Sequence, residues 1–140
     1  MRDLEFRAWD TEAKCYIEEP ILVDNFGNVY VVCEKASNEQ GTCLITGKPN
    51  VILEQYTGLK DKNGQKIYEG DIVTFMVERF NNVTLGFESE DWHTAVVEWN
   101  QDDACYSFMV RDVPFSVRYE AEVIGNIHKQ PELLAANDVD

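Results

Sequence analysis

The residues that most often perform catalysis are few in this sequence, and their spacing matches no familiar catalytic motif. The two histidines, His93 and His128, lie far apart, and neither belongs to an H-E-x-x-H segment. No G-x-S-x-G segment supplies a serine nucleophile. A cysteine nucleophile needs a nearby base, and nothing assigns either histidine to a particular cysteine. We therefore expect a protein that is not an enzyme.

A near match to the phosphate-binding P-loop lies at residues 41–49. The motif requires glycine where Thr42 stands, and serine or threonine where Pro49 stands. Because that missing hydroxyl is the one that binds Mg²⁺, we reject the segment as a nucleotide site. We expect no cofactor of any kind.

Acidic side chains form two clusters, and carboxylates grouped in this way could bind a cation. Glu88, Glu90 and Asp91 form the first, and Asp102 and Asp103 form the second. Neither has the D-x-[DN]-x-[DN]-G spacing of a calcium loop, so we predict a solvated acidic surface and no metal site. Two carboxylates from distant strands could still form a hydrolytic pair, but the sequence selects no such pair.

An aromatic residue beside the first acidic cluster suggests a different role. Trp92 follows this cluster directly, and aromatic residues are enriched at protein interfaces. The alternative is burial, because large aromatic residues of small β domains usually lie in the core. The candidate protein-interaction surface comprises Glu88, Glu90, Asp91, Trp92, Asp102 and Asp103.

The net charge argues against nucleic acid as a direct partner. The chain of 140 residues has 26 acidic and 12 basic side chains, a formal net charge of -14, and would repel phosphate. Residues 1–56 carry 5 basic and 10 acidic side chains, residues 57–80 carry 4 of each, and residues 81–140 carry 3 basic and 12 acidic. No segment is basic, and most of the excess acidity follows residue 80.

The cysteines and the hydropathy indicate a reduced, cytoplasmic protein. The four cysteines, at positions 15, 33, 43 and 105, show no zinc-binding spacing. No apolar leader follows Met1, and no apolar run approaches the roughly 20 residues of a membrane-spanning helix. We therefore expect free thiols and no membrane segment, with Cys33 and Cys105 facing the core.

The apolar pattern predicts many short strands separated by turn residues, and almost no helix. The predicted strands are residues 4–9, 15–17, 21–23, 29–33, 43–45, 72–80, 83–87, 94–99, 105–110 and 121–124. We predict an acidic loop at residues 88–91 and a short helix at residues 132–136, after Pro131.

The clearest local signal is a hairpin turn at Asn63 and Gly64. This dipeptide is typical of a type I′ turn, in which both central residues have positive φ. Such a turn places Asp61 opposite Lys66, and Leu59 opposite Tyr68. Gly70 and Asp71 then open a long strand, where glycine permits a tight corner and aspartate can accept bonds from nearby amides.

These elements predict a mainly β protein with two parts. Residues 1–54 form a β-hairpin-rich N-terminal segment, and residues 55–140 form a small SH3-like barrel with a short terminal helix.

Three segments, in this order, resemble the YopX family of bacteriophage and prophage proteins. They are Phe-Arg-Ala-Trp-Asp at residues 6–10, the stretch 55–73, and Glu-Val-Ile-Gly-Asn-Ile at residues 122–127 followed by Pro-Glu-Leu-Leu at 131–134. The resemblance implies a β-rich fold with an SH3-like barrel in its C-terminal part, a phage origin and the bacterial cytoplasm. It implies no activity and no site residues.

Several hypotheses about function follow. The first is a non-enzymatic phage accessory protein that binds another protein. The second is an acidic mimic of nucleic acid that binds a DNA-binding protein of host or phage, which the acidity of residues 81–140 favours. The third is direct nucleic-acid binding, which is suggested only by analogy with other SH3-like barrels. Exposed strand edges also allow a homo-oligomer.

Overall fold

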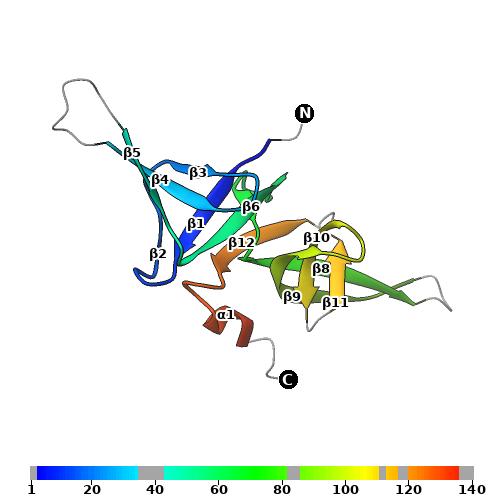
Figure 1. Ribbon diagram of the computed structural model, residues 1–140. Helices are drawn as coiled ribbons and strands as arrows, with labels where there is room; N and C mark the ends of the chain where they lie inside the picture. Colours follow the sequence, from blue (N-terminus) through cyan, green and yellow to red (C-terminus); the bar gives the residue numbers. More distant parts are fainter. Residues whose placement is uncertain (1–2, 35–42, 82–85, 111–112, 117–119, 136–140) are drawn as a thin grey trace. The chain divides into compact units, whose positions relative to one another are not determined.

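The computed structural model describes residues 3–34, 43–81, 86–110, 113–116 and 120–135. The described chain is mainly β, as predicted, and it divides into two compact units (Figure 1). The N-terminal unit comprises residues 4–55, and the C-terminal unit begins at residue 56. Strand β6 (Val51–Lys60) contributes its first half to one unit and its second half to the other.

The N-terminal unit contains two antiparallel sheets. One has the order β2-β1-β6, and the other has the order β3-β4-β5. The strands are β1 (Phe6–Asp10), β2 (Cys15–Tyr16), β3 (Ile21–Val23), β4 (Val29–Glu34) and β5 (Cys43–Gly47). The predicted hairpins of β1 with β2 and of β3 with β4 are confirmed, as is the short strand β5. The small core includes Ala8, Trp9, Val29 and Val31.

The C-terminal unit contains a five-stranded antiparallel sheet in the order β11-β10-β9-β8-β12. Its strands are β8 (Asp71–Asn81), β9 (Gly86–Asn100), β10 (Cys105–Val110), β11 (Val113–Ser116) and β12 (Ala121–Asn126). The second half of β6 pairs with β7 (Lys66–Tyr68), and helix α1 (Glu132–Ala135) follows β12. No helix of the described residues is long and apolar enough to cross a membrane.

One face of the five-stranded sheet forms an apolar core. Val73 and Phe75 of β8 lie beside Ala95 and Val97 of β9, and all four are fully buried. Phe108 of β10 is also fully buried, with its ring centroid 5.1 Å from that of Phe75. Phe115 of β11, a strand that the pattern did not predict, lies 5.4 Å from Phe75. The buried residues of β8 and β9 follow the period-two alternation of side chains along a strand.

The predicted register of the β6–β7 hairpin is wrong. Lys60 pairs with Lys66, and Tyr56 pairs with Tyr68, so Asp61 does not face Lys66. Gly64 has a φ of 83°, whereas Asn63 does not have the positive φ that a type I′ turn requires. The amide of Gly64 donates to the carbonyl of Asp61, and the amide of Asp61 donates to the carbonyl of Gln65. This is a three-residue loop with a bulge at glycine.

The carboxylate of Asp61 explains this longer loop. Its Oδ1 accepts bonds from the amides of Asn63 (2.8 Å) and Gln65 (2.9 Å), and its Oδ2 accepts one from Val123 of β12 (3.0 Å). The side chain is therefore buried as a cap on the turn and a link to the edge of the sheet.

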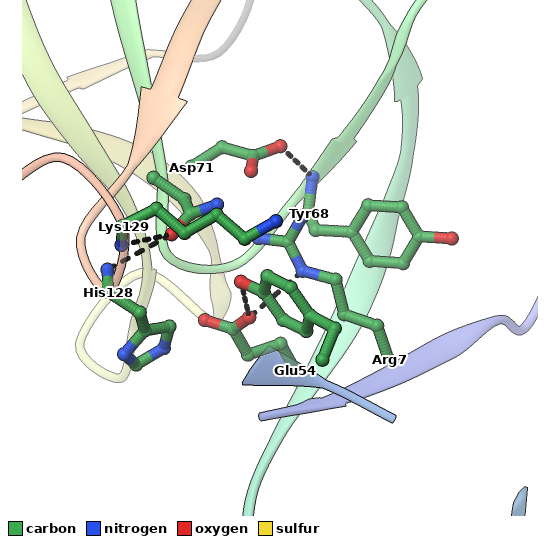
Figure 2. A network of polar contacts seen from close by, with 8 residues as sticks. Arg7, Glu54, Tyr68, Asp71, His128 and Lys129 are labelled. Atoms are coloured by element: carbon green, nitrogen blue, oxygen red, sulfur yellow. Dashed lines mark hydrogen bonds and ion pairs between the residues drawn. The ribbon is translucent and has the colours of Figure 1, made fainter. Parts of the chain in front are cut away.

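The corner before β8 matches its prediction. Gly70 has a φ of 82°, and Asp71 Oδ2 accepts a bond of 2.8 Å from the amide of Tyr68 (Figure 2). Positive φ favours glycine at this position. The Asp71 carboxylate thereby provides a hydrogen-bond acceptor for the Tyr68 amide at the corner.

Two further expectations are corrected. Residues 88–91 are not a loop, because β9 runs without interruption from Gly86 to Asn100 and pairs with β8. Cys105 does not face the core but is exposed. Its neighbour Tyr106 faces the core, so strand parity turns the cysteine to the opposite face. Cys33 lies in β4, and its side chain is outside those that the structure describes.

Candidate functional site

The structure separates the candidate interaction residues into two places. Asp91 and Trp92 lie in the first half of β9, whereas Asp102 and Asp103 lie in the turn between β9 and β10. Trp92 and Asn100 are eight steps apart along extended strand, a distance of about 27 Å at the usual rise per residue. Glu88 and Glu90 also lie in β9, but their side chains are outside those that the structure describes.

Trp92 is presented to solvent by the sheet. Its side chain is 64% exposed and lies opposite Met76 of β8, on the face that does not contain Phe75. Asp91 points to the other face and is half-buried, opposite Val77. The aromatic ring therefore has the exposure that an interface residue needs, while the neighbouring carboxylate lies on the opposite side of the strand.

The second acidic pair belongs to a hydrogen-bonded turn. Asn100 Oδ1 accepts bonds from the amides of Asp102 and Asp103, and Asn100 Nδ2 donates to Asp103 Oδ2 at 3.0 Å. Trp99 beside this turn is 44% exposed and rests edge-on against Tyr106, with ring centroids 5.1 Å apart. These contacts give Asp103 a structural role in the turn.

The N-terminal unit contains a buried polar network that the sequence did not reveal. Glu54 of β6 is 3% exposed, and its Oε1 accepts bonds from Arg7 Nε (2.9 Å) and Tyr16 Oη (2.8 Å) (Figure 2). The Arg7 guanidinium carbon lies 4.6 Å from the centre of the Tyr16 ring. The buried carboxylate is therefore paired and bonded at the junction of β1, β2 and β6, and removing either charged partner would leave the other uncompensated.

The same unit has two open cavities, of about 520 and 530 Å³. The first lies between the β3–β4–β5 sheet and β6, and is lined by Gly27, Asn28, Val29, Tyr30, Gly47, Lys48, Pro49, Val51 and Leu53. The second has more charged residues in its lining, which comprises Asp10, Ala13, Cys15, Tyr16, Ile17, Glu18, Glu19, Val31 and Lys48. Within the described residues, no three potential ligands are grouped as a metal ion requires.

Comparison with known protein families gives a match that covers most of the chain. The YopX protein family model matches residues 5–135, and the chain belongs to this family. A comparison with curated proteins found no match.

Among solved structures, the chain resembles the crystal structure of protein EF1440 from Enterococcus faecalis. The two chains share 27% sequence identity with a TM-score of 0.57, over 96% of this chain and 99% of EF1440. The similarity covers both units, so the two proteins share a fold over nearly the whole chain.

Proposed function

We propose that this chain is an accessory protein of a bacteriophage or prophage that acts in the bacterial cytoplasm by binding another protein. We infer that its C-terminal unit is a small SH3-like barrel that serves as the binding module, without catalytic activity. Membership of the YopX family and the mainly β fold support this proposal.

The observation that carries the proposal is the exposure of Trp92 on β9, at a position where the strand pairs with β8. A tryptophan that is 64% exposed leaves much of a large apolar ring in water, so covering that ring with another surface is favourable. Its backbone is fixed by pairing with Met76, so little conformational freedom is lost on binding. Tryptophan is also among the residues that most often dominate binding energy at interfaces.

The charge indicates the chemistry of the partner. Residues 81–140 carry 12 acidic and 3 basic side chains, and a surface of this sign is complementary to a basic one. We propose a partner protein with an apolar pocket for Trp92 and basic residues around it.

The test is affinity capture from phage-infected host cells with matched variants. We expect Trp92→Ser to lose a protein that the wild type captures, while Leu59→Ser, an exposed apolar residue elsewhere in the C-terminal unit, retains it. Equal capture by wild type and Trp92→Ser would contradict a binding role for this surface.

The acidity of residues 81–140 also supports a second candidate, an acidic mimic of nucleic acid. In that case, the captured protein binds DNA, and DNA competes with this chain for it. Binding would also weaken steeply with added salt, because the attraction between exposed charges is screened. A partner that DNA does not displace from this chain would exclude the mimic and leave the first proposal standing.

A further inference from the structure

The N-terminal unit exposes a second large aromatic side chain. Phe26, in the turn between β3 and β4, is 84% exposed and is the most exposed large hydrophobic residue in the described part of the chain. Isolated surface apolar residues are common, so exposure alone assigns no role to this ring. Two further features lie beside it: a hydrogen-bonded turn that carries the ring, and a cavity that adjoins this turn.

The turn holds Phe26 in a fixed position. Asp24 Oδ1 accepts bonds from the amides of Phe26 and Asn28, both at 2.9 Å, and Asp24 Oδ2 accepts bonds from Asn28 Nδ2 (2.9 Å) and Tyr30 Oη (3.2 Å). The backbone of Asp24 also bonds with Gly27 and Asn28, and Gly27 has a φ of 85°. A ring on so constrained a turn loses little conformational freedom on binding.

The first cavity adjoins this turn, because Gly27 and Asn28 form part of its lining. Val29, Val51, Leu53 and Pro49 contribute apolar groups, and Lys48 contributes a positive charge. The volume of about 520 Å³ lies in the range of about 300–1,000 Å³ in which proteins enclose small organic groups. A phenyl ring occupies less volume than this cavity provides.

One surface of the unit therefore carries both an exposed ring and a cavity that can receive one. Two copies related by a twofold axis place the same patch against itself, so each contact occurs twice. The charges are also complementary, since Asp24 lies on the turn that enters and Lys48 lies in the wall that receives it. We propose that this chain forms a dimer in which Phe26 of each copy occupies this cavity of the other.

The first test is sedimentation velocity of the full chain over a range of concentrations. We expect the wild type to dimerise, and Phe26→Ser to raise the dimer dissociation constant at least about tenfold, as loss of a central aromatic contact does. Leu59→Ser serves as the matched control with unchanged association. A wild type that stays monomeric, or a Phe26→Ser variant that dimerises as tightly as the wild type, would overturn the proposal.

A complementation experiment tests the specific pairing of ring and cavity. A Cβ added at Gly47, which lines the cavity, meets only Tyr30 ring carbons, at 3.9 Å, so the position accepts a side chain, and Gly47→Leu is chosen to reduce the cavity. Each single variant is expected to be monomeric, whereas a mixture of Phe26→Ser and Gly47→Leu restores one of the two contacts and forms mixed dimers. A mixture that associates no better than either variant alone would contradict this pairing, provided that circular dichroism shows both variants folded.

This proposal does not depend on the binding role of Trp92. Self-association is measured with purified protein, and Trp92→Ser is expected to leave it unchanged. Failure of dimerisation and failure of partner capture are therefore separate outcomes.

Discussion

The interior of the C-terminal unit differs from the interior of the N-terminal unit in the interactions that it contains. The C-terminal unit has a continuous apolar core in which Phe75, Phe108 and several aliphatic residues are fully buried. The N-terminal unit has a smaller core, a buried Glu54 paired with Arg7, and two open cavities. The comparison indicates that the C-terminal unit depends more on apolar burial, while the N-terminal unit combines a smaller core with a buried ion pair and open cavities.

The largest effect is expected from Phe75→Ala in the C-terminal core. Phe75 is fully buried against Phe108, Phe115 and His93, and such truncations cost about 3–5 kcal/mol. Urea denaturation should show this loss of stability, while Trp92→Ser should change it by less than about 0.5 kcal/mol, as exposed substitutions do. A loss below about 1 kcal/mol for Phe75→Ala would contradict a tightly packed core.

A smaller effect is expected from Asp61→Asn, which alters the polar link in the same unit. Only one oxygen remains to accept bonds from Asn63, Gln65 and Val123, and an unsatisfied buried group costs about 1–3 kcal/mol. The check is urea denaturation at neutral pH. An unchanged midpoint would show that the turn does not need the carboxylate.

Asp61 should also give the fold a dependence on acid. Burial raises the pKa of this carboxyl, but the bonds from Val123, Gln65 and Asn63 outweigh burial and hold the pKa below its ordinary value of 3.8. The carboxylate therefore stabilises the fold above pH 3.8, and this contribution is lost as the pH falls through the lowered pKa. Asp61→Asn should be less sensitive to pH in that window.

The smallest of these effects is expected from Glu54→Gln in the N-terminal unit. Glutamine keeps an acceptor for Arg7 and Tyr16 but removes the charge, so about 1–2 kcal/mol of charge-assisted bonding is lost. Hydrogen exchange should show faster opening of β1, while the amides of β8 and β9 stay protected. Equal acceleration in both units would contradict their separate stabilisation.

The sequence predicted the elements that depend on local alternation. Phe75 shares one face of β8 with Val73, and Phe108 shares one face of β10 with Tyr106, as a period of two requires; which face is buried is known from the structure. The β6–β7 register was wrong because the bond from Val123 to Asp61, 62 residues away, helps to select the loop. The Arg7–Glu54 pair and the ring-and-cavity surface also join distant segments, so neither leaves a local pattern.

The candidate site was only partly predictable for a similar reason. The sequence placed Trp92 beside acidic residues, but it could not show that β9 is continuous or that the indole faces solvent. It also treated the two acidic clusters as one surface, because separation along a strand appears only once the strand's length is known.

The most direct test of the binding account is the affinity of the purified, captured partner for the wild type and for Trp92→Ser, measured by isothermal titration calorimetry. We predict that Trp92→Ser weakens binding at least about tenfold, as loss of a dominant interface residue does, while Leu59→Ser does not. Equal affinity of the wild type and Trp92→Ser would contradict the proposal that this protein binds its partner through the Trp92 surface.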